Sequence, residues 1–216
     1  MSAVQLKNWT PFNWGDSEKL MGRRSDHSRA ELQALILATG HAVMAETGYA
    51  RFSAREVAKR IGYSIGTVHN VFGSHDRLVL AINTRTFALW AAHLRAALAA
   101  GGEDRIAALV AGYFDFATAH TNLWTAIYDH RLPEGEKMPD EDDAARAELT
   151  KIVVREVATA LHREPDGTVA ALARSLVAVV HGHCAFLLAG SWALMGETAP
   201  EAAALARVRE ALAAAG

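Results

Sequence analysis

Residues 61–80 read IGYSIGTVHNVFGSHDRLVL and carry the strongest local signals of structure in the chain. Three glycines interrupt the apolar residues, so no uninterrupted segment is long enough to form a stable helix alone. Gly62 and Gly73 bound a short segment that Ser64 can cap, which predicts a helix over 65–71. A helix of two turns buries little surface, so this one must pack against its neighbours.

The residues on either side predict three further helices. Ser74 opens a long helix that ends at the pair of glycines after residue 100. Upstream, a helical period of apolar residues begins at Ser28 and stops at Gly48. Ser53 and Glu56 match the S-x-x-E pattern of a capping box, which predicts a second short helix just before the quoted stretch.

Two short helices joined by a glycine-containing turn match the helix-turn-helix that binds DNA. Ala58 on the first helix lets the second approach closely, Gly62 supplies the turn, and Val68 closes the small core. The helix over 65–71 is then the one that enters the major groove, where small and hydrogen-bonding side chains can meet base edges. The predicted DNA contacts are Ser53, Ser64, Ile65, Gly66, Thr67, His69, Asn70, His75, Arg51, Arg23 and Arg24.

The basic residues near this motif have two interpretations. Arg23 and Arg24 can reach into a minor groove, although solvated arginines before a helix are the commoner case. Residues 1–75 hold nine Lys and Arg against six Asp and Glu, whereas the remainder is acidic, which suits a polyanion binding to the first part. Pairing with phosphates and plain solvation are both open for Arg51, Arg55, Lys59 and Arg60.

The rest of the chain predicts an all-α protein, because Ala and Leu dominate after residue 80 and no alternating strand pattern occurs. We expect an N-terminal extension over 1–27, a helix-turn-helix DNA-binding domain over 28–75, and a larger ligand-binding and dimerisation domain over 76–216. The last two helices are rich in small residues, which allow the close packing of a four-helix homodimer interface. Later helices are expected near 103–120, 122–131, 140–162, 167–190 and 198–214.

Composition and cysteine content bear on the compartment. Apolar residues make up 51% of the 216, enough for a sizeable core. The single cysteine, Cys184, allows no intrachain disulfide and suits a reducing compartment. The first residues have no apolar signal-peptide core, and the apolar run over 175–196 is broken by two histidines and three glycines. We therefore expect a cytoplasmic protein with no membrane partner.

Residues 28–80 resemble the N-terminal domain of TetR-family transcriptional regulators. The resemblance is carried by ILATGHAVMAETGYARFSAREVAKRIGYSIGTVHNVFGSHDRLVL, in which SAREVA, IGYSIGTV, Phe72 and SHDRL match in order and spacing. The chain departs from the family at His69, where an aromatic, commonly Tyr, is usual, and at His75, where Lys is usual. Both family residues typically touch phosphates, so the resemblance implies weaker or differently arranged phosphate contacts here.

The second half is similar to a subgroup of this family whose ligand domain contains a His-Gly motif, here His181-Gly182. The tryptophan expected shortly before the motif is absent, and Val177 stands near that place. We expect an effector pocket within this domain, for a small and largely apolar molecule. The aromatic and polar residues available for it, each more often core than ligand contact, are Trp90, Phe114, Phe116, Trp124, Tyr128 and His181.

The sequence gives little support to a metal site or to an enzyme. His181 and Cys184 share a helix face, whereas His183 points elsewhere and no second ligand pair is visible. A hydrogen-bonded histidine and a core cysteine are therefore preferred, and neither a metal nor a cofactor is expected. No Ser/His/Asp spacing, phosphate loop or metal signature indicates an enzyme.

These signals together predict a homodimeric repressor that binds double-stranded DNA. Two recognition helices should meet half-sites about 34–36 Å apart or at a nearby spacing, on a roughly palindromic operator. A small-molecule effector would release the protein by favouring a dimer geometry that no longer fits. The alternatives are a helical ligand- or partner-binding module without DNA function, and an enzyme.

Overall fold

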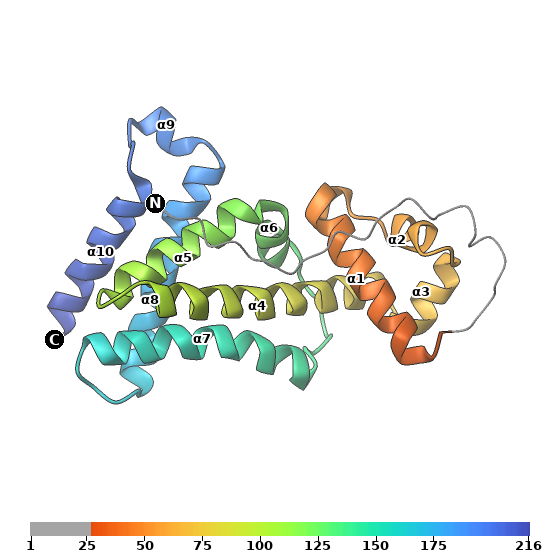
Figure 1. Ribbon diagram of the computed structural model, residues 1–216, viewed down its shortest axis with the longest axis horizontal. Coiled ribbons are helices and arrows are strands. Elements are labelled where there is room, and N and C mark those ends of the chain that lie inside the picture. Colours follow the sequence, from red (N-terminus) through yellow and green to blue (C-terminus); the bar gives the residue numbers. More distant parts are fainter. Residues whose placement is uncertain (1–26) are drawn as a thin grey trace.

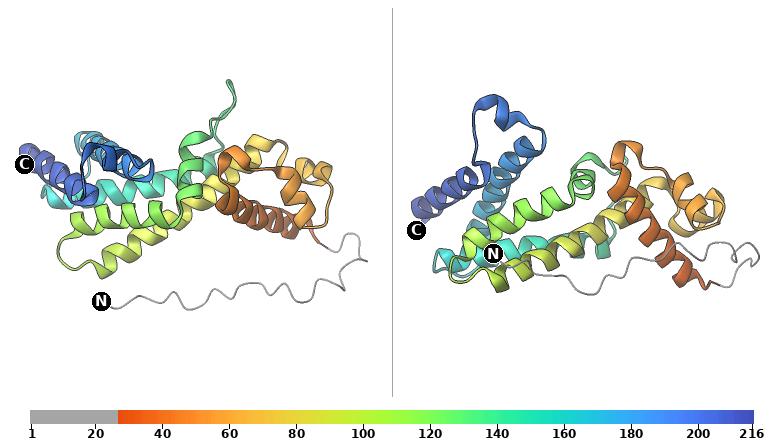
Figure 2. Two further views of the ribbon diagram at one scale, coloured as in Figure 1. Left: turned by 90° about the horizontal axis from the view of Figure 1, so that it is seen from above. Right: turned by 45° about the horizontal axis from the view of Figure 1, so that its top comes forward.

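Residues 27–216 are described by a computed structural model, and they form helices without any β-strand. The all-α fold predicted from the sequence is confirmed. The elements are α1 Arg29–Thr47, the 3-10 helix η2 Tyr49–Arg51, α2 Ala54–Arg60, α3 Ile65–Phe72, α4 His75–Ala100, α5 Arg105–Ala119, α6 Thr121–Asp129, α7 Asp140–Ala160, α8 Gly167–Leu188, α9 Ser191–Met195 and α10 Pro200–Ala215. Figures 1 and 2 show an elongated molecule, with α1–α3 at one end and a larger bundle at the other, joined by α4.

Serine side chains begin three helices near the N-terminal end of the described chain. Ser28 Oγ accepts a hydrogen bond from the Glu31 backbone N–H (3.3 Å), and the Glu31 carboxylate accepts one from the Ser28 N–H (2.7 Å). This reciprocal pair is a complete capping box at the start of α1. Ser64 and Ser74 accept bonds from backbone N–H groups in the first turns of α3 and α4. The predicted starts of these two helices are confirmed.

The predicted capping box of Ser53 and Glu56 is wrong. Ser53 lies at the N-cap of α2, but its side chain makes no capping hydrogen bond. The Glu56 carboxylate instead accepts from Arg60 Nε at 2.9 Å, one turn along the helix, and Arg60 also bonds Glu46 of α1 at 2.8 Å. These ion pairs occupy the carboxylate that the capping box needs, and they tie α2 to α1.

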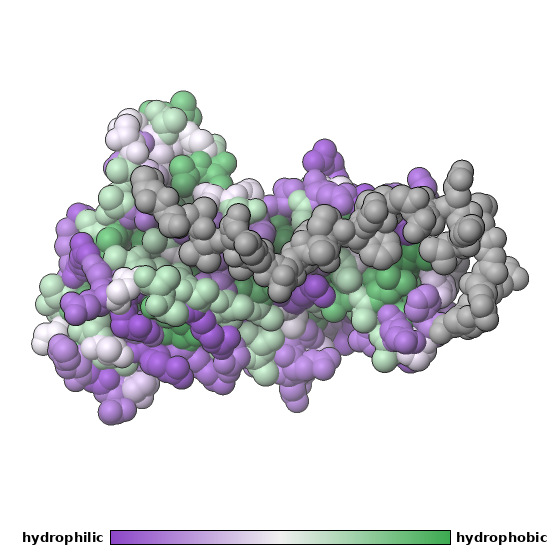
Figure 3. Space-filling view, in the orientation of Figure 1, coloured by the Kyte–Doolittle hydropathy of each residue, from purple (hydrophilic) through white to green (hydrophobic). Residues whose placement is uncertain are grey.

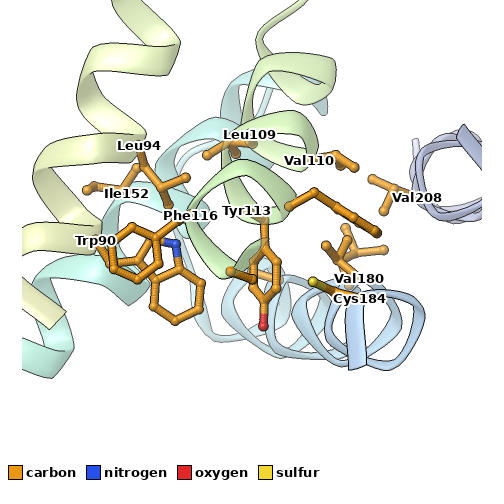
Figure 4. Packing of buried hydrophobic residues seen from close by; sticks show 14 of the residues in the cluster. Trp90, Leu94, Leu109, Val110, Tyr113, Phe116, Ile152, Val180, Cys184 and Val208 are labelled. Atoms are coloured by element: carbon orange, nitrogen blue, oxygen red, sulfur yellow. The ribbon is translucent and has the colours of Figure 1, made fainter. Parts of the chain in front are cut away.

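The buried side chains form two hydrophobic cores, one at each end of the molecule. The first core joins α1–α3 to the beginning of α4 and to α6, and it includes Val57 and Val68. The second fills the bundle of α4–α8 and α10, and Figure 4 shows part of it around Trp90 and Tyr113. Helix α4 contributes residues to both cores, so the two cores do not divide the chain at one residue. The predicted domain boundary at residue 75 stays a prediction.

The helices of the second half lie close to their predicted positions, but α9 was not expected. It occupies five residues between Gly190 and Gly196. These glycines have left-handed φ angles of 70° and 77°, which interrupt the helix on either side of α9. Such a short helix has no apolar period to recognise. Trp192 holds it against α8, since Trp192 Nε1 donates to the His183 carbonyl at 2.7 Å. The segment projects from the bundle in Figure 2.

Helix α8 is long and apolar enough to cross a membrane by length and composition, and among the described helices it alone passes this test. One such helix is a weak indication of a membrane, because core helices of soluble proteins pass the same test. In this chain α8 packs against α7, α5 and α10 through residues such as Leu176 and Val180. Phe186 and Leu187 of α8 are exposed, and Figure 3 shows hydrophobic surface over α9, where Leu194 is 91% exposed.

The capping geometry makes a direct prediction about stability. Ser28→Ala should lower the free energy of unfolding by about 1 kcal/mol, because the Glu31 backbone N–H loses the Ser28 hydroxyl as its acceptor. Ser53→Ala is the matched control and should cost less than about 0.5 kcal/mol, because its hydroxyl caps nothing. Urea unfolding at one protein concentration measures both, and equal losses in the two variants would contradict the assignment of the caps.

Candidate DNA-binding face and internal cavity

Helices α2 and α3 meet at a tight turn that fixes the exposed side of α3. Gly62 in the turn has a φ of 74°, which glycine adopts without strain, and Tyr63 N donates to the Ala58 carbonyl at 3.0 Å. Ala58 and Val68 are each 2% exposed. This small buried contact lets the two short helices pack closely, so the side of α3 opposite Val68 faces solvent.

The exposed side of α3 carries three of the predicted contact residues. Gly66, His69 and Asn70 are exposed. A Cβ added at Gly66 would meet Ser64 Oγ alone, at 3.5 Å, so another molecule can approach this backbone closely. Thr67 is half-buried, and its hydroxyl lies 3.0 Å from Ser64 Oγ. Asn70 and His69 therefore offer the freest polar groups on this side of the helix.

The remaining predicted contacts lie on other elements or outside the described residues. The His75 ring begins α4 and lies against the Phe52 ring, with centroids 5.6 Å apart. Arg51 is exposed and its Nε donates to a backbone carbonyl at the end of α1 at 3.2 Å. Arg23 and Arg24 lie outside the described residues. The half-buried members of the predicted set are Thr67, Ile65, Ser53 and His75.

The basic residues of α2 differ in how free they are. Arg60 is bonded to the carboxylates of Glu46 and Glu56, and these bonds raise the pKa of its guanidinium. Arg55 and Lys59 are exposed. A phosphate that binds Arg60 would have to compete with these two carboxylates. A phosphate that binds Arg55 or Lys59 would not meet this competition.

A cavity of about 50 Å³, partly open to the surface, lies in the second core among α4, α5, α7, α8 and α10. Aliphatic side chains form almost all of its wall, and no charged residue belongs to it. Tyr113 is the one lining residue with a polar side-chain atom. Each of the five helices contributes at least one aliphatic residue, for example Leu94, Leu109, Val157, Val180 and Val208.

None of the residues predicted for a pocket lines this cavity. Trp124, Tyr128 and His181 gather around Tyr113, whereas Phe116 stacks on Trp90 with centroids 5.2 Å apart. Tyr128 is 37% exposed and His181 is half-buried. The buried members of the predicted set are Trp90, Phe114, Phe116 and Trp124.

Tyr113 is the residue that sequence reasoning missed. Its hydroxyl lies 3.0 Å from His181 Nδ1 and 3.3 Å from the Tyr128 hydroxyl, so it links α5, α6 and α8. A sequence signal for it exists, because Leu109, Tyr113 and Phe116 follow a helical spacing of four and three on one buried face of α5.

The groups around Tyr113 favour their uncharged forms. Burial raises the pKa of Tyr113, with the neighbouring Tyr128 adding to the effect, and burial also raises the pKa of Tyr128. Burial lowers the pKa of His181 and raises that of Cys184 to about 11. His183 Nδ1 lies 2.9 Å from the Val179 carbonyl of its own helix. Among residues 27–216, no group of three His, Cys, Asp or Glu side chains is placed to bind a metal.

Helix α6 connects this cluster to the end of the molecule that carries α1–α3. Leu123 and Ala126 are buried in the first core, while Trp124 and Ile127 are buried in the second. The Ala126 carbonyl accepts a hydrogen bond from the buried Asn83 of α4 at 3.2 Å. Opposite faces of one short helix therefore belong to the two ends of the molecule.

Further polar contacts join this region to the first core. Asn122 Nδ2 donates to the Ala45 carbonyl of α1 at 2.8 Å, and His130 Nε2 lies 3.2 Å from a carboxylate oxygen of Asp76. The first bond reaches α1 and the second reaches the first turn of α4. Displacement of α6 would thus act on the helices that support α3.

Two domain families match the chain. Residues 36–82 match the profile described as bacterial regulatory proteins, tetR family, and residues 106–212 match the tetracyclin repressor-like C-terminal domain. Search of curated proteins gave no match.

Several solved structures share the fold. A protein of unknown function from Rhodococcus sp. RHA1 has 21% identity and a TM-score of 0.66, over 92% of this chain and 98% of that one. The multidrug binding protein EbrR, complexed with imidazole, has 21% identity and a TM-score of 0.58, over 86% and 96%. Reduced NemR of E. coli has 19% identity and a TM-score of 0.53, over 82% and 96%. At these identities the likeness concerns the fold alone.

Proposed function

Since the chain belongs to the TetR family of bacterial regulatory proteins, we propose that it is a repressor released from a palindromic operator by a small, largely apolar effector. It is a DNA-binding transcriptional regulator, and its family is one of regulators rather than enzymes. The main observation behind the proposal is that α6 contributes buried residues to both cores. It therefore joins the bundle that holds the cavity to the end of the molecule that carries α3. We expect the protein to act in the cytoplasm.

DNA binding is assigned to the exposed side of α3. His69 and Asn70 project from a helix that is fixed by its cap, its glycine turn and the buried Val68. A fixed helix orients its side chains before binding, so little conformational freedom is lost on contact with a base edge. Arg51 and His75 flank the helix and are assigned to phosphates, as are Ser53 and Ser64.

Dimer formation is assigned to α8 and α10. Five residues of α8 are buried within the chain, so much of this apolar helix remains available to a second copy. A Cβ added at Gly182 would meet no atom within 4 Å, which leaves room for the close approach of another helix. The small side chains on this accessible side include Ala171, Ser175 and Ala178.

Effector response is assigned to the aliphatic cavity and the cluster around Tyr113. The cavity of about 50 Å³ is smaller than an organic effector, so binding has to push its walls apart. Trp124 and Tyr128 stand on α6 and contact His181, so pressure on this cluster reaches α6 directly. The effector would shift the equilibrium by its higher affinity for the displaced form.

The recognition helix is tested by Asn70→Ala. The variant should bind operator DNA more weakly by about 1–3 kcal/mol, because a contact to a base edge is lost. Its unfolding should stay unchanged, since the side chain is exposed. A mobility-shift titration on the DNA upstream of its own gene, at fixed salt, measures the affinity. Thr150→Ala, on the exposed side of α7, is the control, and equal affinities in the two variants would remove Asn70 from the interface.

The dimer interface is tested by Ala178→Glu. The wild type should have a solution mass of about twice 23.2 kDa by light scattering, and the variant should approach the mass of one chain. An interface through this side of α8 would bury a carboxylate from each copy, which is costly. Ala92→Glu on α4 is the matched control and should stay dimeric. A dimeric Ala178→Glu variant would place the interface elsewhere.

A further inference from the structure

The lining of the cavity restricts the electrical charge of an effector. Ten aliphatic side chains and Tyr113 form the wall, so a charged group placed there would lose its water without gaining an opposite charge. His181, which lies beside Tyr113, does not favour that charge either, because burial lowers its pKa. A neutral molecule avoids this cost of losing water around a charge.

Tyr113 separates the cavity from two buried indole rings. Trp90 meets Tyr113 edge-on with ring centroids 4.9 Å apart, and Trp124 does so at 6.2 Å. Because the cavity is small, an effector has to enlarge it, and Tyr113 is the lining residue against which the two indole rings pack. Enlargement on that side brings the effector toward the two indoles.

Both indole N–H groups lack a hydrogen-bond partner among the described residues. Trp90 is 1% exposed and Trp124 is 3% exposed, so neither Nε1 atom is compensated by bulk water. The Trp124 ring lies beside Tyr113 and His181, with ring centroids 6.2 Å and 4.9 Å away, but its Nε1 meets hydrogen-bond geometry with neither residue. Unpaired buried donors are uncommon in folded proteins and are unfavourable until an acceptor reaches them.

We propose that the effector is an uncharged molecule bearing an acceptor oxygen, which binds the indole N–H of Trp124 or Trp90 while its hydrocarbon part fills the aliphatic cavity. Neutral carbonyl compounds, such as aryl ketones, belong to this class. Carboxylates and ammonium ions do not. The inference rests on the proposed effector-binding role of this domain, and it adds the chemistry by which the effector is recognised.

Three probes of similar size separate the alternatives. Acetophenone carries a neutral acceptor oxygen, ethylbenzene replaces it with hydrocarbon, and benzoate carries a negative charge. Calorimetric titration of the free protein should show acetophenone binding tighter than ethylbenzene by about 2- to 12-fold for each hydrogen bond formed. Benzoate should bind more weakly than either. Equal affinities for the first two, tightest binding of benzoate, or no binding of acetophenone would each overturn the proposal.

The indole groups can be observed individually by NMR in protein labelled with ¹⁵N-tryptophan. Acetophenone should move the N–H proton resonance of Trp124 or Trp90 downfield, as expected for a newly formed hydrogen bond, and ethylbenzene should not. Trp192 is the internal control, because its indole already donates to the His183 carbonyl. A bound acetophenone that leaves both buried indole resonances in place would overturn the proposal while leaving the cavity as its site.

Substitution gives an independent readout. Trp124→Phe and Trp90→Phe together should reduce the preference for acetophenone over ethylbenzene to about onefold, because phenylalanine offers no donor. Trp192→Phe should keep the wild-type preference. An unchanged preference in the double variant would contradict the proposal, and its fold is checked by circular dichroism. These titrations contain no DNA, so their failure is distinct from a failure of the DNA-binding assignment.

Discussion

Helix α6 is buried from two sides, and the relation between the two ends of the molecule depends on this constraint. Helix α4 also enters both cores, but it does so at different points along its length. The nine residues of α6 do so within about two turns, with Ala126 facing one core and Ile127 the other. A helix this short moves as one body, so neither face can shift without the other.

The contacts of α6 also show where the junction can yield. Asn83 is 1% exposed and donates to the Ala126 carbonyl, yet its own carbonyl oxygen has no hydrogen-bond partner among the described residues. A half-satisfied buried amide is costly, so a movement of α6 that brought a donor to the Asn83 oxygen would be favoured. The apolar contacts of Leu123 oppose such a move, because they would be lost from the first core. Two arrangements of α6 separated by a small free energy would give the response that a regulator needs.

Local signals in the sequence were sufficient for the DNA-binding end. Ser64, Gly62 and Gly73 act on residues within one turn of themselves, so their effect can be recognised without knowing the fold. The capping box at Ser53 failed because Arg60 is held by Glu46, a partner from another helix that the local pattern does not contain.

The cavity could not be located from sequence for a related reason. Trp90, Tyr113 and Phe116 are all aromatic residues on helices, and only the packing of five helices decides which of them borders an empty space. Helical spacing places Tyr113 on the buried face of α5 but cannot distinguish a cavity wall from solid core. The predicted contacts of Arg23 and Arg24 fall outside the described residues, so they remain predictions.

Hydrogen exchange of the protein with and without operator DNA tests the coupling through α6 most directly. If α6 belongs to both cores, DNA bound at α3 should slow amide exchange in α6 and in the part of α5 around Tyr113, because linkage between two sites is reciprocal. Protection confined to α1–α3 and the first turns of α4, with unchanged exchange in α6, would contradict the account.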